Sequence, residues 1–483
     1  MGLEQAVQKA GFSIGWQPSA GKSADSRDGF LKMRDWQLRA FEQLKAAPFM
    51  ILNAPMGSGK SSLMCWLSAS KMMNDDSLRC IIVVPQTIIA AGFIDEKLQM
   101  SDGEKVYWQI QYNLCSEKFN RGTVKYFAEW LEKQPKTFSD RVILCTHATL
   151  VAVYRRLKAE GRLHLLKDLL LWIDEAHHVK NVMAEDLDGM VINNGIGELV
   201  VYFLDNCAKN LQMGLTTASF FRGDRASLLT DEMEAKFVRF NLPYDEYLRS
   251  MKHLKSFSFD FLLSGLNYIK AIETVVHDHK GKDIIYIPHP VSQYSTGKKY
   301  QEVDDIISIY GVMVQTTADG VTIVQGEKGD QKILDLVSEA HRKQKKNYLD
   351  NPILKKRSDA LDVIIALGMF KEGANWIYAD RSIIVGARSS LVDVIQMVGR
   401  LFRDAEGKKH VRVIQLLPFS LDQQDQDSFR ENLNNYLKAI YASLLLENIL
   451  NPVKIKAVQK AEKAEHEKAD GDSKNWLLSA HDK

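Results

Sequence analysis

The sequence has little net charge, no paired cysteines and no long apolar run. Its 483 residues carry a formal net charge of +2, so any surface that binds nucleic acid has to be local. The five cysteines are scattered and form no C-x-x-C pair, which favours a reduced, intracellular protein. No apolar run reaches membrane-spanning length, and the N-terminus lacks the apolar stretch of a signal peptide. We therefore expect a cytoplasmic protein without a membrane partner.

Short apolar runs separated by helical stretches are the main pattern of the sequence. The chain is longer than one hydrophobic core usually supports, which favours two domains. Most runs are continuous rather than alternating, as is typical of strands buried on both faces of a parallel sheet. The pattern predicts an α/β fold with two doubly wound parallel-sheet domains. The expected strands are 80–85, 141–146, 169–174 and 211–216 in the first domain, and 283–288, 320–325, 361–366, 382–385 and 411–416 in the second.

The stretches around these runs set the expected domain boundaries. Residues 231–240 and 247–272 have a helical character and predict a helical connector. The run from 434 to 450 is apolar and periodic, which favours a helix that packs on the second domain. The predicted division is a polar N-terminal segment 1–30, a first domain 31–228, the connector 229–280, a second domain 281–420 and a helical C-terminal extension 421–483.

A glycine-rich loop follows the first apolar run and precedes a helical pattern. Strand, glycine loop, lysine, hydroxyl and helix form the arrangement of a phosphate-binding loop. Gly57 and Gly59 let the backbone approach phosphate oxygens closely. Lys60 would reach the β- and γ-phosphates of a nucleotide, and the Ser61 hydroxyl would hold Mg²⁺. Taken alone, this loop is also consistent with an ordinary Gly/Ser turn that binds no nucleotide. The predicted nucleotide-binding loop reads Pro55-Met56-Gly57-Ser58-Gly59-Lys60-Ser61-Ser62.

Two adjacent acids end the apolar strand at 169–174. Strand ends of this kind place carboxylates beside the phosphate loop of the same sheet. Asp174 would hold the Mg²⁺, and Glu175 would orient and polarise the attacking water. His177 would sit near the γ-phosphate of the bound nucleotide. A zinc site at His177 and His178 is disfavoured, because adjacent residues rarely both bind the metal.

A basic segment near the end of the second domain is the third predicted site. Gln396, Arg400 and Arg403 recur at helical spacing, which predicts that one helix face carries all three. Arginine suits a transition-state clamp because its planar guanidinium stays charged and binds phosphate oxygens bidentately. Delivered from a second domain, such arginines would make hydrolysis depend on domain closure. The chain has no second phosphate loop, which favours one nucleotide shared by two domains.

Together these motifs resemble a superfamily 2 helicase or translocase of the DEAH type. The resemblance covers about residues 31–418. Within the superfamily, the chain is most similar to the motors of restriction enzymes and to DNA-repair helicases. It implies two RecA-like domains that clamp ATP with Mg²⁺ between them. It also implies that Gln37, in an Arg-x-x-Gln pattern with Arg34, reads the adenine. Glu175, Lys60, Gln396, Arg400 and Arg403 would then carry catalysis.

The same resemblance assigns candidate contacts to the nucleic-acid backbone. They are Pro85, Gln86 and Thr87 in motif Ia, Thr146 and His147 in motif Ib, and Pro288 in motif IV. Two departures stand out. The segment at 214–219 lacks the proline of the family's Leu-Thr-Ala-Thr-Pro, which puts the coupling role of Thr216 and Thr217 in doubt. In motif V, Gly373, an expected nucleotide contact, is followed by Asn375 instead of the usual aspartate.

Three functions are consistent with this resemblance. The first is an ATP-driven helicase or translocase on DNA, gripping the strand through its phosphates. The second is a nucleic-acid-triggered ATPase that acts as a switch or loader for partner proteins in DNA repair or anti-phage defence. The third is an RNA helicase. No nuclease or methyltransferase motif is recognisable, so a separate effector or nuclease protein is a possible partner.

Overall fold

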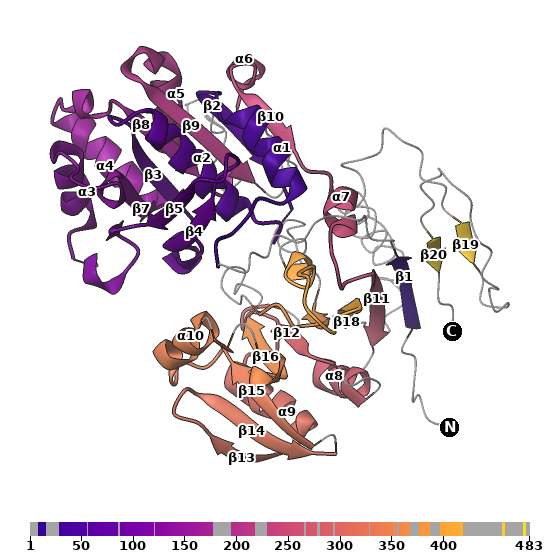
Figure 1. Ribbon diagram of the computed structural model, residues 1–483. Helices are drawn as coiled ribbons and strands as arrows, with labels where there is room; N and C mark the ends of the chain where they lie inside the picture. Colours follow the sequence, from indigo (N-terminus) through magenta and orange to yellow (C-terminus); the bar gives the residue numbers. More distant parts are fainter. Residues whose placement is uncertain are drawn as a thin grey trace, which may run out of the picture. The chain divides into compact units, whose positions relative to one another are not determined.

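The computed structural model divides the chain into two compact units (Figure 1). One unit comprises Ala20–Tyr247, and the other comprises Met1–Ser19 together with Leu248–Lys483. None of the helices in the described part of the chain combines the length and apolarity that a membrane crossing requires. The structure describes residues 8–15, 29–55, 57–85, 87–119, 121–176, 195–217, 229–264, 267–277, 281–292, 295–327, 329–351, 353–354, 357–367, 376–386, 397–418, 456–458 and 477–479.

The Ala20–Tyr247 unit is built on a seven-stranded sheet in which every pairing is parallel. Its central strands are buried along their whole length, because helices cover both faces of the sheet. The expected strands of this domain are therefore confirmed. In spatial order the strands are β10 (Val238–Asn241), β2 (Phe49–Asn53), β9 (Leu211–Thr217), β8 (Leu169–Ile173), β3 (Arg79–Val84), β7 (Val142–Thr146) and β6 (Tyr112–Asn113).

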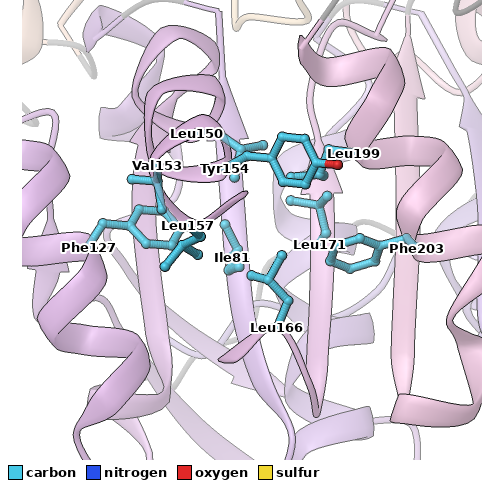
Figure 2. Close-up of a pocket in the computed structure, with 10 residues that line it drawn as sticks. All are labelled: Ile81, Phe127, Leu150, Val153, Tyr154, Leu157, Leu166, Leu171, Leu199 and Phe203. Atoms are coloured by element: carbon cyan, nitrogen blue, oxygen red, sulfur yellow. The ribbon is translucent and has the colours of Figure 1, made fainter. Parts of the chain in front are cut away.

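Three helices cover one face of this sheet and form a hydrophobic core with it. Their apolar side chains pack on the sheet around a small cavity lined by ten mainly aliphatic and aromatic residues, including Phe127, Val153 and Phe203 (Figure 2). The cavity holds about 10 Å³, which is at most the space of one water, so it is a packing gap rather than a ligand site. The three helices are α3 (Thr123–Glu132), α4 (His147–Ala159) and α5 (Gly195–Asp205).

The remaining elements of this unit include the helix that begins directly after the predicted phosphate loop. Two helices, α1 and α2, lie in contact with each other, and α2 begins at Lys60 directly after the loop. An antiparallel pair of strands, β4 and β5, follows β3 and is tied to α2 by the Trp66 Nε1 bond to Gln99 O at 3.1 Å. The bounds are α1 (Asp35–Leu44), α2 (Lys60–Asn74), β4 (Asp95–Gln99), β5 (Lys105–Gln109) and α6 (Asp231–Glu234).

The second unit contains a nine-stranded mixed sheet. Its six central strands are parallel, and antiparallel strands extend it at both edges. The strands expected in the second domain are confirmed, although the run at 320–325 lies in an antiparallel hairpin. In spatial order they are β1 (Gln8–Gly15), β11 (Ser256–Ser264), β18 (His410–Pro418), β17 (Arg381–Val385), β12 (Asp283–Ile287), β16 (Val363–Leu367), β15 (Gly329–Asp335), β14 (Val321–Gly326) and β13 (Val312–Thr316).

Two helices form the core of this unit on one face of its sheet. Ile272 and Ile306 are fully buried against Ile285 and Ile365 of the central strands. A buried ion pair between Arg381 and Asp283 lies at the beginning of β12 and β17 and fixes these neighbouring strands to α8. The helices of the unit are α8 (Tyr268–His277), α9 (Lys299–Tyr310) and α10 (Arg342–Asp350), and α7 (Tyr244–Arg249) spans the boundary between the units.

Two expected segments differ from the structure, and the structure does not describe a third. The stretch 229–280 is not a helical connector, because β10 adds to the first sheet and β11 to the second. The N-terminal stretch 1–30 contains β1, which pairs with β11 over eight residues. The helix expected at 434–450 lies outside the described residues. Within 421–483 the structure describes only β19 (Lys456–Val458) and β20 (Leu477–Ser479), which pair in parallel.

Candidate nucleotide-binding site

The loop between β2 and α2 depends on two glycines in left-handed backbone conformations. Gly57 has a φ of 77° and Gly59 a φ of 101°, values that residues with a side chain rarely adopt. A Cβ added to Gly59 would also lie 2.8 Å from Nε2 of Gln37, so the Gln37 side chain would have to shift. A loop of this conformation directly before a helix N-terminus can cradle phosphate oxygens. The conformation favours the phosphate loop over an ordinary Gly/Ser turn.

Arg34 and Gln37 hold this loop from the beginning of α1. Arg34 Nη1 donates to the carbonyl of Ser58 at 2.9 Å, and Gln37 Nε2 donates to the carbonyl of Gly59 at 3.0 Å. The side-chain oxygen of Gln37, Oε1, in turn accepts a hydrogen bond from the Arg34 backbone amide at 2.8 Å. Sequence reasoning assigned Gln37 to the adenine, and that contact stays a prediction. The structure adds that both ends of its amide help to fix the phosphate loop.

Lys60 is buried at the first position of α2. Its Nζ donates to the carbonyl of Ala54 at 2.8 Å, which closes the loop on itself. Burial raises the pKa of Asp174, and the positive charge of Lys60 opposes that rise, which places the two predicted motifs in one site. A lysine held by a single backbone carbonyl can exchange that partner for a phosphate oxygen.

Asp174 and Glu175 follow β8 at the same sheet edge as the loop. β9 lies between β2 and β8, and its Thr216 hydroxyl donates to Asp174 Oδ1 at 2.5 Å. The Asp174 backbone amide donates to the carbonyl of Val83 at 2.8 Å, and a ring nitrogen of His147 lies 3.0 Å from the Asp174 carbonyl oxygen. The neighbouring strands β9 and β3 and the first residue of α4 therefore hold Asp174, and Thr216 binds its carboxylate directly. Sequence reasoning left the role of Thr216 open, and the structure gives it a direct partner.

The pKa of Asp174 is raised from 3.8 to about 6. Burial is the largest cause, and repulsion from the Glu175 carboxylate is the second. Lys60 and the Thr216 hydrogen bond act in the opposite direction but do not offset them. A buried carboxylate of this kind favours a nearby cation, since a positive charge restores the ionised form. The oxygen atoms of Asp174 and Ser61 are of the type that Mg²⁺ prefers, so this donor set fits the expected metal.

Glu175 has an unusual backbone conformation for a residue with a side chain. Its φ is 49°, in the left-handed region. The residue is also buried, so its side chain and backbone are both constrained. Strained backbone of this kind gathers at functional sites, where surrounding structure holds it in place. This agrees with, but does not test, the predicted role of Glu175 in orienting water.

The predicted nucleic-acid contacts in this unit lie at the ends of two strands. Thr87 is exposed at the start of a 3₁₀ turn after β3, and Pro85 directly follows that strand. Thr146 caps α4, since its hydroxyl accepts from the Thr149 amide at 3.3 Å. His147 contacts the backbone of Asp174, a link between the motifs that sequence reasoning did not foresee. Their nucleic-acid contacts remain predictions.

Arg400 and Arg403 lie in the other unit, just before β18. The described helix covers only 397–399 and ends at Gly399, so the helix predicted through 396–403 is wrong beyond that residue. Glycine is a poor helix former and often ends a helix, which explains the early end. Arg400 is buried, and the Arg403 amide donates to the carbonyl of Leu401 at 2.8 Å. Periodicity alone therefore does not place these two arginines on one helix face.

The other predicted site residues complete this account. Pro288 follows β12 and is buried, so in this structure it offers little surface to a nucleic acid. Ser61 and Ser62 begin α2 together with Lys60. Five predicted residues lie outside the described part of the chain, and they are Met56, Gln86, His177, Gly373 and Gln396.

The fold and the motifs define the class of protein. Residues 30–219 match the family described as "Type III restriction enzyme, res subunit", and both units carry the parallel sheets of RecA-like domains. The chain belongs to the superfamily 2 helicase-like motors of this type. It is 32% identical over 425 residues to the "Putative ATP-dependent helicase YeeB" of Bacillus subtilis (strain 168). That match covers 87% of this chain and 66% of the relative, so the chain spans somewhat less than two thirds of the relative's length.

Solved structures show the same fold. The DUF1998 helicase MrfA bound to DNA aligns with a TM-score of 0.55 and 12% identity, over 88% of this chain and 56% of MrfA. The ATP-dependent Type ISP restriction-modification enzyme LlaBIII bound to DNA aligns with a TM-score of 0.54 and 15% identity, over 85% of this chain and 30% of LlaBIII. At these identities the likeness concerns the fold alone.

Proposed function

We propose that this chain is an ATP-hydrolysing motor that steps along nucleic acid, with DNA as the track. The observation that carries the proposal is the cluster at one sheet edge of Ala20–Tyr247. Lys60, Asp174 and Glu175 are buried there, and the Thr216 hydroxyl bonds Asp174. DNA is favoured over RNA because the solved structures MrfA and LlaBIII are both described as bound to DNA.

In the proposed mechanism this unit holds ATP through the phosphate loop. Lys60 leaves the carbonyl of Ala54 and binds the β- and γ-phosphates. Ser61 and Asp174 would hold Mg²⁺, which when bound neutralises negative charge that develops on the phosphates. Glu175 orients the attacking water and accepts its proton. Gln37 reads the adenine while Arg34 keeps the loop in place.

The second unit supplies two arginines, so that ATP hydrolysis depends on closure of the two units. Arg400 and Arg403 stabilise the charge of the transferred phosphoryl group, a role worth about 10³ to 10⁵ in rate in well-studied cases. ATP binding closes the two units on each other, and hydrolysis with product release opens them. Alternation of grip on the phosphate backbone then gives directed stepping with weak sequence preference and a strong dependence on salt.

ATP turnover measured with different nucleic acids tests the proposal. Phosphate release is followed without nucleic acid and with single-stranded DNA, duplex DNA or RNA, beside a strand-displacement assay. We expect stimulation by DNA, and loss of turnover in Lys60→Ala and in Glu175→Gln with unchanged thermal unfolding. Near-wild-type turnover in either variant would remove the active-site assignment.

The same panel separates the alternatives. Stimulation by RNA alone would replace the DNA motor with an RNA helicase. Stimulation by DNA without strand displacement and without directional movement would favour the nucleic-acid-triggered switch, which loads or releases a partner such as an effector nuclease. Movement along duplex DNA without displacement would identify a translocase.

A further inference from the structure

The segment that carries Arg400 and Arg403 is anchored by Asp404, the next residue in the chain. Asp404 Oδ2 accepts a hydrogen bond from the Lys252 amide at 2.7 Å. Its Oδ1 accepts from the His253 amide at 2.7 Å and from the Leu254 amide at 3.0 Å. One carboxylate therefore binds three consecutive backbone amides. Hydrogen bonds to an ionised acceptor are shorter and stronger than neutral ones, so this is a firm attachment.

The three amides belong to the loop that enters the second unit. The chain passes from one unit to the other between Tyr247 and Leu248, inside α7, and the loop then leads into β11 (Figure 1). Leu254 is fully buried, so the loop is packed into its own unit and is not a loose tether. The loop that Asp404 binds is therefore the first part of the second unit after the connection.

Two further side chains, Lys408 and Phe402, hold the residues around Asp404. Lys408 Nζ donates to the carbonyl of Leu401 at 2.6 Å and to that of Ile377 at 3.0 Å. The ring of Phe402 packs edge-on against Phe257 of β11, with 4.9 Å between the ring centroids. The backbone from 401 to 405 has no regular secondary structure. Side-chain contacts, rather than a helix or strand ladder, therefore determine where the two arginines sit.

We propose that Asp404 is a positioning residue that couples Arg400 and Arg403 to the connection between the two units. It does not touch the nucleotide. It holds Arg400 and Arg403 in register with the Lys252–Leu254 loop, so that a movement of the connection changes the position of the guanidinium groups. The inference rests on the proposed function, in which these arginines complete the ATP site.

A purely structural role for Asp404 is the competing explanation, and the two differ in what a substitution changes. If Asp404 only stabilises the fold, its substitution would lower the unfolding temperature and leave the turnover of the folded enzyme unchanged. A positioning residue would lower kcat while the KM for ATP stays nearly constant, because the phosphate loop in the other unit still binds the nucleotide. A displacement of about 1 Å in a catalytic constellation can cost about 100-fold in rate.

Asp404→Ala, Asp404→Asn and Asp404→Glu in the full chain test the inference. The control is Asp362→Ala, because Asp362 also accepts a backbone amide, from Lys332 at 2.9 Å. Asp362 precedes β16, and two strands separate β16 from β18. Thermal unfolding, DNA-stimulated kcat and the KM for ATP are measured for each variant.

We expect kcat to fall about 10- to 100-fold in Asp404→Ala with KM within about twofold of wild type. Asp404→Asn keeps one acceptor oxygen and Asp404→Glu keeps both, so we expect both to recover part of kcat. Asp362→Ala should lower the unfolding temperature and leave kcat unchanged. An equal loss of kcat in Asp362→Ala, or a wild-type kcat in folded Asp404→Ala, would overturn the inference.

Arg400→Ala in the same assays separates this inference from the proposed function. If Arg400→Ala loses turnover while Asp404→Ala retains it, the coupling by Asp404 is wrong and the motor assignment stands. If Arg400→Ala retains wild-type turnover, the arginines do not complete the ATP site, and the inference that rests on them is wrong as well.

Discussion

Glu175 shows at the scale of one residue how a predicted function conflicts with stability. A left-handed φ costs a residue with a side chain about 1 to 2 kcal/mol, and Glu175 has a φ of 49°. It also stands beside Asp174, and the two carboxylates repel each other. A protein selected for stability alone would place glycine at this position. A glutamate in this strained position agrees with a chemical role for its carboxylate.

Replacing Glu175 by glycine and by alanine measures this strain. Both variants lack the carboxylate and should lose ATP turnover. Glycine relieves the backbone and alanine does not, so we expect Glu175→Gly to be more stable than Glu175→Ala by about 1 kcal/mol. Urea unfolding at pH 7 measures the difference. Glycine is normally the less stable of the two, so an Ala variant that is equal or better would show that the position is not strained.

Asp174 makes stability depend on pH in a direction opposite to that of most acids. Its folded pKa of about 6 lies above the ordinary 3.8, so the folded protein holds the proton more tightly than the unfolded chain does. The contribution of the Asp174 carboxyl to the free energy of unfolding is therefore fully present below about pH 4. It is lost as the pH rises through about 6. Asp174→Asn keeps an acceptor for Thr216 and carries no charge. We expect its stability advantage over wild type to grow by up to about 3 kcal/mol between pH 4 and pH 7 without Mg²⁺.

Denaturant unfolding at the two pH values, with a chelator present, measures this advantage. Asp205→Asn, at the exposed end of α5, is the control for an Asp-to-Asn substitution at the surface. A constant difference between Asp174→Asn and wild type would mean that the Asp174 carboxyl is not perturbed in the folded protein.

At the scale of elements, one hydroxyl joins the helix of the phosphate loop to β8, the strand that Asp174 follows. Ser68 on α2 accepts from Trp172 Nε1 of β8 at 2.8 Å and donates to the Met64 carbonyl at 2.7 Å. Ser68 and Trp172 are both buried. Ser68→Ala should lower the free energy of unfolding by about 1 to 3 kcal/mol, because it leaves the indole N–H buried without an acceptor.

The matched control for this substitution is Ser70→Ala on the same helix, since Ser70 is only partly buried. We expect it to change stability by less than about 0.5 kcal/mol. Chemical unfolding followed by tryptophan fluorescence compares the two. Equal losses would show that the α2–β8 hydrogen bond contributes nothing specific.

Most of the strands could be predicted from the sequence, but the elements of 229–280 could not. The strands of both sheets were predictable because they are continuous apolar runs between helices, and the glycine loop was predictable because its chemistry requires a fixed order of residues. The region 229–280 was misjudged. β10 is only four residues long and gains its stability from pairing with β2, which no local pattern reveals. β11 alternates serine and phenylalanine at 256–259, a strand signal that the surrounding helical pattern obscured.

Side-chain contacts between distant segments were the least predictable part of the site. The spacing of Gln396, Arg400 and Arg403 suggested a helix, yet the structure ends that helix at Gly399 and fixes the following residues through Asp404 and Lys408. The bond from Thr216 to Asp174 likewise depends on β9 lying next to β8. Such contacts follow from strand order, which periodicity does not specify.

At the scale of the whole molecule, the division between the units lies later than the sequence indicated. The first unit extends to Tyr247 rather than 228, because 229–247 contributes an edge strand and aromatic contacts to it. Phe237 packs against Phe49 of β2, with ring centroids 5.6 Å apart, and Phe240 stacks on Trp36 of α1 at 6.4 Å. We therefore expect a fragment of residues 20–247 to unfold cooperatively, whereas a fragment of residues 20–228 loses this edge and is less stable.

The 20–247 fragment also separates nucleotide binding from hydrolysis. It retains Lys60, Asp174 and Glu175 and lacks Arg400 and Arg403. If the two arginines complete the ATP site, the fragment should bind a fluorescent ATP analogue within about tenfold of the affinity of the full chain. Its turnover should be lower by about 10³ or more, because no arginine then stabilises the negative charge of the transition state. Phosphate release at saturating ATP and DNA measures the turnover, and Lys60→Ala in the fragment is the control for specific binding. A fragment that hydrolyses ATP as fast as the full chain would show that one unit contains the entire catalytic apparatus.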